Sequence, residues 1–235
     1  MQKYPNLPVL TTQQMIEVDR LMIEEWGITL IQMMENAGRN MAELSRRLLS
    51  GVQNKKITVL CGTGNNGGGG MVAARHLHNW GAEVNALLVR EESQLKEVPA
   101  NQWKILKRMD IVTSDFDLSK ADLIIDTMLG YGVDGNPREP IASWIRRANE
   151  SKVPIIALDA PSGLDTTTGI PASPCIRAHS TLTLALPKTG LVTPEAKPFV
   201  GDLYLADISV PPELYAKLNI HMSSPFGSDT IIKAD

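Results

Sequence analysis

Apolar residues in the first fifty positions recur three and four apart, a spacing that predicts two amphipathic helices. The first covers MIEVDRLMIEEW, with Thr11 or Thr12 as its cap and Gly27 as its stop. The second covers ITLIQMMENAGRNMAELSRRLL, and Arg46 and Arg47 near its end interact favourably with the helix dipole. Two N-terminal helices are therefore expected ahead of the first strand.

From residue 57 the pattern changes to short β-branched runs that alternate with longer amphipathic ones, which is typical of βαβ units around a parallel sheet. The pattern predicts strands over residues 57–61, 84–89, 110–114, 122–126, 154–159, 180–186 and 202–208, with helices over 71–80, 94–108 and 139–150. After Asp159, Pro and Gly become frequent, so loops are expected to connect the last strands.

These elements predict an α/β fold of Rossmann-like, three-layer α/β/α architecture with a mainly parallel central sheet. Neither a linker nor an internal repeat divides the sequence, so residues 1–235 are interpreted as one domain. The last stretch, SSPFGSDTIIKAD, predicts a loosely ordered tail over about 221–235.

Composition and charge argue against a partnership with nucleic acid or with a membrane. The chain is 43% hydrophobic and 21% charged, as in ordinary globular proteins. A net charge of −3 offers no basic field for a polyanion, so no nucleic-acid partner is expected. Two cysteines make no disulfide framework, and no apolar run is long enough to cross a bilayer, which favours a cytoplasmic protein with no membrane association.

A glycine-rich segment, CGTGNNGGGGMVAARHL, follows the first predicted strand and precedes a helical pattern. Gly62, Gly64 and Gly67 form a GxGxxG match, whose backbone amides and helix N-terminus suit a phosphate group. Asn65 and Asn66 add side-chain donors and acceptors, although Asn also forms turns for backbone reasons. The alternative is a flexible turn without a ligand.

A dinucleotide-binding dehydrogenase would carry an acidic residue about 20 positions further on, at the end of the second strand. This region reads Arg90, Glu91 and Glu92. These three residues are compatible with a group that binds a ribose 2′-hydroxyl, with a group that binds a 2′-phosphate, or with a solvated loop. No redox function follows from it.

Two further predicted strands end in carboxylates, Asp126 and Asp159. Because parallel strand ends meet at one edge of a sheet, both carboxylates and the segment 62–70 are expected to line one crevice. Each Asp by itself could equally cap a helix or a turn. Two carboxylates, an amide and a hydroxyl such as that of Ser162 would make an oxygen-rich cage for a hard cation.

Two other features border the same crevice in this interpretation. The segment GYGVDGNPREP, residues 130–140, is either an ordered lid or an ordinary surface connection. Lys188, after the strand at 180–186, either reaches a ligand phosphate or lies in solvent. The helices over residues 12–49 carry more apolar surface than a peripheral hairpin leaves in water, which predicts a homodimer.

Four spaced segments resemble the NAD(P)H-hydrate epimerase family, also called the YjeF N-terminal domain family. They are MMENAG at 33–38, CGTGNNGGGGMVAARHL at 61–77, DTMLGYGVDGNPREP at 126–140 and DAPSGLD at 159–165. The resemblance implies an isomerase that interconverts the R and S forms of hydrated NADH and NADPH. A separate dehydratase would then restore the S form to usable cofactor.

The resemblance also implies the site. Substrate would be bound by Asn65, Asn66, Gly67, Gly68, Gly69, Gly130, Tyr131, Gly132, Val133, Asp134, Gly135, Asn136 and Asp159. A potassium ion would be held by Asn66, Asp126 and Ser162. The family's usual NNGGDG reads NNGGGG here, so Gly69 stands where an acidic residue is common.

The hydroxyl at C6 of the hydrate lies beside the ring nitrogen, so its loss and return through an iminium or ring-opened species would invert that carbon. Asp159 is the predicted general acid/base for the departing and returning oxygen. The alternative is a non-catalytic module on the same fold that binds a nucleotide-like ligand or another partner. A dehydrogenase is the third hypothesis. It would consume or make NAD(P)H with a second substrate, whereas an epimerase requires only the hydrated cofactor.

Overall fold

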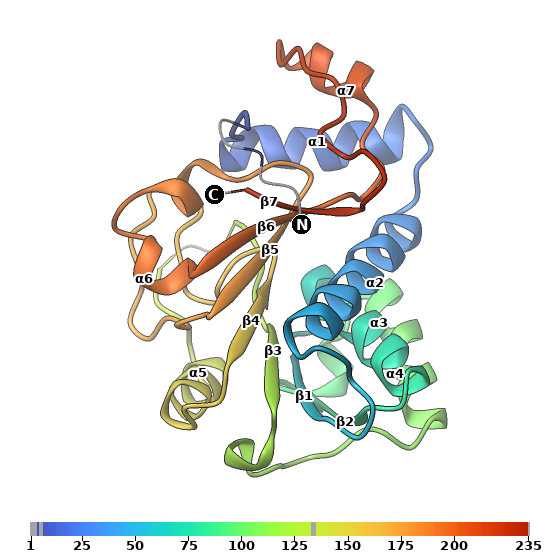
Figure 1. Cartoon of the computed structure of the whole chain (residues 1–235), viewed down its shortest axis with the longest axis vertical. Coiled ribbons are helices and arrows are strands. Elements are labelled where there is room, and N and C mark those ends of the chain that lie inside the picture. The colour runs from blue at the N-terminus through green and yellow to red at the C-terminus, as the bar shows by residue number, and fades with distance from the viewer. Residues whose placement is uncertain (1–3, 5–6, 133–134, 235) are drawn as a thin grey trace.

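A computed structural model describes residue 4 and residues 7–132 and 135–234. Its centre is one seven-stranded sheet in the order β2-β1-β3-β4-β5-β6-β7 (Figure 1). All neighbouring strands pair in parallel except β6 and β7. The strands are β1 (Lys56–Cys61), β2 (Glu83–Leu88), β3 (Leu123–Thr127), β4 (Ile155–Leu158), β5 (Ser180–Leu184), β6 (Asp202–Ala206) and β7 (Ile231–Lys233).

Helices cover both faces of the sheet. In Figure 1, α2, α3 and α4 lie on one side and α5 and α6 on the other, while α1 runs beside α7. The α-helices are α1 (Thr12–Glu24), α2 (Leu30–Leu48), α3 (Asn65–Asn79), α4 (Glu97–Arg108), α5 (Ile141–Glu150), α6 (Lys197–Val200) and α7 (Pro212–Lys217). Short 3₁₀ turns are η1 (Glu92–Gln94), η2 (Leu118–Lys120) and η3 (Thr189–Val192). The predicted Rossmann-like α/β fold is confirmed.

Burial explains why the strands were recognisable. Every residue of β3 and of β4 is buried, as expected for parallel strands covered on both faces. The two N-terminal helices are also confirmed. Thr11 caps α1 through a capping box, in which the Gln14 backbone N–H donates to Thr11 Oγ1 at 3.1 Å and the Gln14 side chain accepts from the Thr11 N–H at 2.9 Å.

Two element predictions were wrong. Residues 110–114 form no strand and contribute one isolated bridge, Val112 with Ala86, because this short run follows α4 directly and only touches the edge of β2. The predicted loose tail over 221–235 instead ends in β7, which pairs antiparallel with β6. Ile231 and Ile232 are almost fully buried there, and their burial anchors the segment.

The start of α3 also differs from the prediction. The helix begins at Asn65, six residues before the predicted start at residue 71, so most of the expected glycine-rich turn is helical. Glycine costs roughly 1 kcal/mol in a helix relative to alanine, which is why the pattern indicated a turn. Close packing of this helix against its neighbours outweighs that cost, as the site geometry shows below.

Register brings the predicted carboxylates to one edge of the sheet. Asp126 pairs with Leu60 of β1 and Ala157 of β4, one residue before the end of each strand. Asp159 follows β4 directly. In the part of the chain that the structure describes, no helix is long and apolar enough to cross a membrane.

Candidate active site

A cavity of about 550 Å³ opens at the carboxyl ends of β1, β3 and β4. Its volume falls in the range of about 300–1,000 Å³ that small-molecule sites occupy. Its polar lining comes from α1, the start of α3, and the segments after β1, β2, β3 and β4. Those residues are Asp19, Thr63, Gly64, Asn65, Asn66, Gly69, Arg90, Lys96, Gly130, Tyr131, Gly132 and Asp159.

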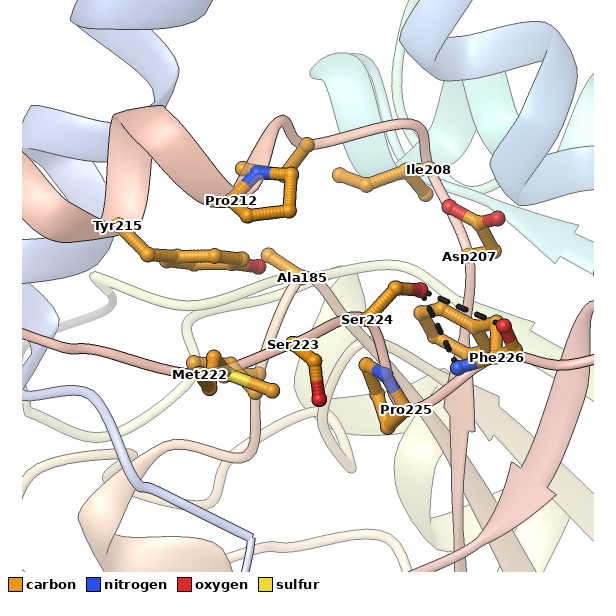
Figure 2. A pocket seen from close by; sticks show the side chains of 12 residues that line it. Ala185, Asp207, Ile208, Pro212, Tyr215, Met222, Ser223, Ser224, Pro225 and Phe226 are labelled. Carbon is orange, nitrogen blue, oxygen red and sulfur yellow. Dashed lines mark hydrogen bonds between the residues drawn. The ribbon is translucent and has the colours of Figure 1, made fainter.

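A second hollow lies between the segment after β6 and residues 222–226. Figure 2 shows Tyr215, Met222 and Phe226 around it, with Ser224 hydrogen-bonded to the backbone of Phe226. Its volume is about 30 Å³. A space of this size holds about one water molecule, so it is too small for a nucleotide.

Asn66 connects the start of α3 to two strand ends. Its Nδ2 donates to the backbone oxygen of Leu129 at 2.8 Å and of Leu158 at 3.1 Å. Asn65 lies beside it on the cavity wall. The N-terminus of a 15-residue helix therefore points its free backbone amides at the cavity, an arrangement that suits a phosphate or another anion.

The glycines of α3 mostly serve packing. A Cβ on Gly67 would lie 1.9 Å from the Gly62 oxygen, and a Cβ on Gly70 would lie 2.1 Å from Thr127 Oγ1. A Cβ on Gly68 would lie 2.6 Å from the side chain of Met34. These three glycines lie outside the described lining of the cavity, and only Gly69 of this run borders it. The run is therefore needed mainly because α3 approaches its neighbours too closely for side chains.

Asp159 is held by contacts to both of its carboxylate oxygens. Lys188 Nζ donates to Oδ1, and the Tyr131 backbone N–H donates to Oδ2 at 3.1 Å. Lys188 is fully buried and also donates to the Leu184 oxygen at 3.1 Å and to Thr183 Oγ1 at 3.3 Å. A buried ammonium group needs a counter-charge, and the Asp159 carboxylate supplies it.

The sequence left two alternatives for Lys188, a contact with a ligand phosphate or a position in solvent, and the solvated position is wrong. Lys188 is fully buried and is the ionic partner of Asp159.

The backbone of Asp159 has a φ of +67°, a conformation that a non-glycine residue adopts at an energetic cost. The sequence signal that could have indicated the Lys188–Asp159 pair was a lysine shortly after one predicted strand and a carboxylate directly after another.

Asp126 and Ser162 form a second buried pair. Ser162 donates from Oγ to Asp126 Oδ1 at 2.6 Å and from its backbone N–H to Oδ2 at 2.8 Å. Burial raises the pKa of Asp126 to about 6, and the two bonds from Ser162 oppose that rise. The Leu129 N–H donates to Ser162 Oγ at 2.9 Å, so Leu129 links this pair to Asn66.

Asp19 is a site residue that the sequence analysis missed. The Tyr131 hydroxyl donates to Asp19 Oδ2, and both residues line the cavity. Burial raises the pKa of the Asp19 carboxyl, and the nearby charge of Asp159 raises it further. Met15 and Met22 are buried one turn away on either side. An acid on the apolar face of a helix was therefore the signal that could have revealed it.

The segment after β3 contributes three of its predicted residues to the cavity, Gly130, Tyr131 and Gly132. Val133 and Asp134 lie outside the described residues. Gly135 and Asn136 lie beyond the described lining, and Asn136 Oδ1 accepts from the Ser173 N–H at 2.9 Å. This contact fixes the far end of the segment to another loop.

Arg90 and Lys96 border the cavity as well. Arg90 Nε is buried with no hydrogen-bond partner among the described residues. The interpretation of residue 90 as part of a merely solvated loop is therefore wrong. The Lys96 backbone N–H donates to the Thr63 oxygen at 3.1 Å, which joins residue 96 to the segment after β1.

The family model for the YjeF-related protein N-terminus matches residues 30–190. This chain belongs to the YjeF N-terminal family. The matched span contains every residue predicted to bind substrate or cation, together with Lys188. Asp19 precedes the span, so the segments that carry the family resemblance do not reveal it.

Curated relatives cover nearly the whole chain. The NAD(P)H-hydrate epimerase of Dehalogenimonas lykanthroporepellens is 39% identical over 95% of this chain and 91% of its own length. That of Nitrosopumilus maritimus is 36% identical over 87% of this chain and 96% of its own length. The bifunctional NAD(P)H-hydrate repair enzyme Nnr of Moorella thermoacetica is 37% identical over 88% of this chain, which spans 42% of that protein.

A solved structure shares the fold of this chain. The crystal structure of yeast ynu0 matches with a TM-score of 0.83 and 25% identity. The match covers 97% of this chain and all of that one. The overall fold of this chain is therefore one seen in an experimental structure.

Proposed function

We propose that this protein interconverts the R and S forms of hydrated NADH and NADPH. The observation that carries the proposal is the meeting of the Asp159–Lys188 ion pair and the N-terminus of α3 at one cavity. The relatives named NAD(P)H-hydrate epimerase, which match along most of their length, support it. The cavity offers a carboxylate paired with a buried lysine at one point of its wall and anion-binding amides at another.

The chemistry needs proton transfer and no hydride transfer. Protonation of the C6 hydroxyl lets the C–O electron pair leave with water, while the N1 lone pair forms the N1=C6 iminium bond. Water then adds to the opposite face of C6, the π electrons return to N1, and the added water loses a proton. Asp159 accepts hydrogen bonds on both carboxylate oxygens, so we assign it as the base that accepts the proton of the added water and as the group that stabilises the cationic ring.

The nucleotide's phosphates would bind at the start of α3. The backbone amides there and the cations of Arg90 and Lys96 border one side of the cavity. Their positive potential suits a diphosphate in a protein whose overall charge is −3. Gly69 borders this cavity, and a Cβ there would lie 2.8 Å from Leu158 Cδ2.

Potassium is the cofactor that we propose, held by Asn66, Asp126 and Ser162. The donors fit a hard monovalent cation, because all three side chains carry oxygen. Asp126 is a fully buried carboxylate, and among the described residues no cationic side chain pairs with it. A bound cation would supply that missing charge and fix the segment that follows β3.

Two partners complete the proposal. A separate NAD(P)HX dehydratase would consume the S form that this protein produces. A second copy of this chain would cover part of α1 and α2, where Ile16, Ile23 and Ile31 are 45–47% exposed. The homodimer is thereby proposed to bury apolar surface that water would otherwise contact.

The deciding experiment supplies purified protein with the isolated R hydrate and an S-specific dehydratase. Recovery of NADH or NADPH that depends on this protein is the expected result. The same assay without dehydratase should show no net oxidation or reduction, which separates an epimerase from a dehydrogenase. Tight binding of the R hydrate with no turnover would instead favour a non-catalytic binding module.

A further inference from the structure

Inversion at one carbon needs proton-handling groups on both faces of the ring. The departing oxygen takes a proton on one face, and the added water gives up a proton on the other. Both carboxylate oxygens of Asp159 already accept hydrogen bonds, from Lys188 Nζ and from the Tyr131 backbone N–H, so neither oxygen is placed to donate the first proton. Under the proposed function, a second group at the cavity must therefore be the acid.

We propose that Asp19 is this acid, positioned by Tyr131. Tyr131 bridges the two carboxyl groups, because its backbone N–H donates to Asp159 and its hydroxyl donates to Asp19. The two acids therefore lie at opposite ends of one tyrosine and come from different elements, α1 and the segment after β4. Both line the same cavity.

The hydrogen bonds distinguish the two carboxyl groups. Asp159 has a cation on one oxygen and an N–H on the other. Asp19 Oδ2 accepts the Tyr131 hydroxyl, while Oδ1 has no hydrogen-bond partner in the described part of the chain. A proton on Oδ1 can therefore face the cavity without breaking the bond to Tyr131.

The groups that face Asp19 favour its protonated form. Tyr131, Asp159 and Lys188 are the charged or titratable groups around it. Burial and Asp159 raise the pKa of Asp19, while the Tyr131 hydrogen bond and Lys188 lower it, and the net direction is upward. Environments that push two neighbouring carboxyl groups toward opposite protonation states assign one as acid and the other as base.

The proton balance closes over one turnover. Asp19 gives its proton to the departing oxygen, the C–O electron pair leaves with that oxygen as water, and N1 forms the iminium bond. Water adds on the face of Asp159, which takes the released proton. The two carboxyl groups return to their starting states by proton exchange with solvent, and no electrons are transferred to or from the substrate.

Asp19→Asn keeps the acceptor for Tyr131 but cannot supply a proton. We expect kcat to fall by about a hundred- to ten-thousandfold with KM changed only a few-fold. The matched control is Glu17→Gln on the exposed part of the same helix, where the carboxylate pairs with Arg20. Turnover in Asp19→Asn equal to that of this control would overturn the proposal.

Tyr131→Phe gives a directional test that a purely structural role would not produce. Wild-type kcat should decline as pH rises through the pKa of Asp19, because the acid is then ionised. Loss of the hydroxyl removes a hydrogen bond that favours the ionised form, so this decline should move to higher pH. A decline that stays in place or moves to lower pH contradicts the assignment.

A measurement without substrate separates this inference from the function on which it rests. Carbon-13 NMR of labelled aspartates should show the Asp19 carboxyl, assigned by its loss in Asp19→Asn, titrating above the ordinary range. A titration at or below that range rules out Asp19 as the acid, whatever the turnover. A wild-type protein that leaves the R hydrate unchanged would instead overturn the proposed epimerase function.

Discussion

Lys188 donates a hydrogen bond to Asp159 in a pair whose side chains are 0% and 6% exposed, respectively. The two residues follow neighbouring strands, β5 and β4. Burial of both charges makes each dependent on the other. The pair therefore joins the chemistry of the site to the stability of the fold.

Asp159→Asn should abolish epimerisation, with a loss of about a hundred- to ten-thousandfold, while much of the nucleotide affinity remains. It should also destabilise the protein by roughly 3–5 kcal/mol, because Lys188 is left buried without a counter-charge. Denaturant unfolding measures the second effect. The double variant Asp159→Asn with Lys188→Met should recover most of the stability and none of the activity. Equal activity in wild type and Asp159→Asn would remove this residue from the mechanism.

Asp126→Asn tests the potassium proposal. The variant weakens the proposed cation site, so its activity should fall and should be partly restored by raised potassium. Asp159→Asn is the matched control and should not respond to potassium, because its carboxylate has the Lys188 cation as partner. Activity assays over a potassium series, with sodium at constant ionic strength, measure both. Equal rescue of both variants would show that Asp159 is also a cation ligand.

Gly67→Ala should destabilise the fold by about 1–3 kcal/mol or more, because the new Cβ would lie 1.9 Å from a backbone oxygen of Gly62. Gly64→Ala is the control, since a Cβ there meets nothing within 4 Å and its φ is −91°. Thermal unfolding of the two variants should therefore give clearly different Tm values. A flexible turn without packing constraints would tolerate both changes alike.

Ile23→Glu should shift self-association toward monomer, because it introduces a charge into the exposed apolar surface of α1. Val192→Glu, at a residue 51% exposed in η3, is the control and should leave the association unchanged. Light scattering over a concentration series distinguishes them. A wild-type protein that stays monomeric at high micromolar concentration would contradict the proposed dimer.

The sequence by itself determined the main architecture. Buried parallel strands such as β3 and β4 are continuous apolar runs, and amphipathic helices repeat every three to four residues, so both periods are local properties. The edge that carries Asp126 and Asp159 also followed from sequence, because parallel strands end on the same side of a sheet. Family segments then indicated the chemistry.

Only the tertiary structure decided what surrounds those carboxylates. The partnership of Lys188 with Asp159 and of Asp19 with Tyr131 joins residues 29 and 112 positions apart, which no local period encodes. The early start of α3 and the order of β7 likewise depend on packing against distant elements. Local patterns report which residues are apolar or flexible. The ionisation of a buried carboxyl depends on which charges and donors the fold brings within hydrogen-bond distance of it.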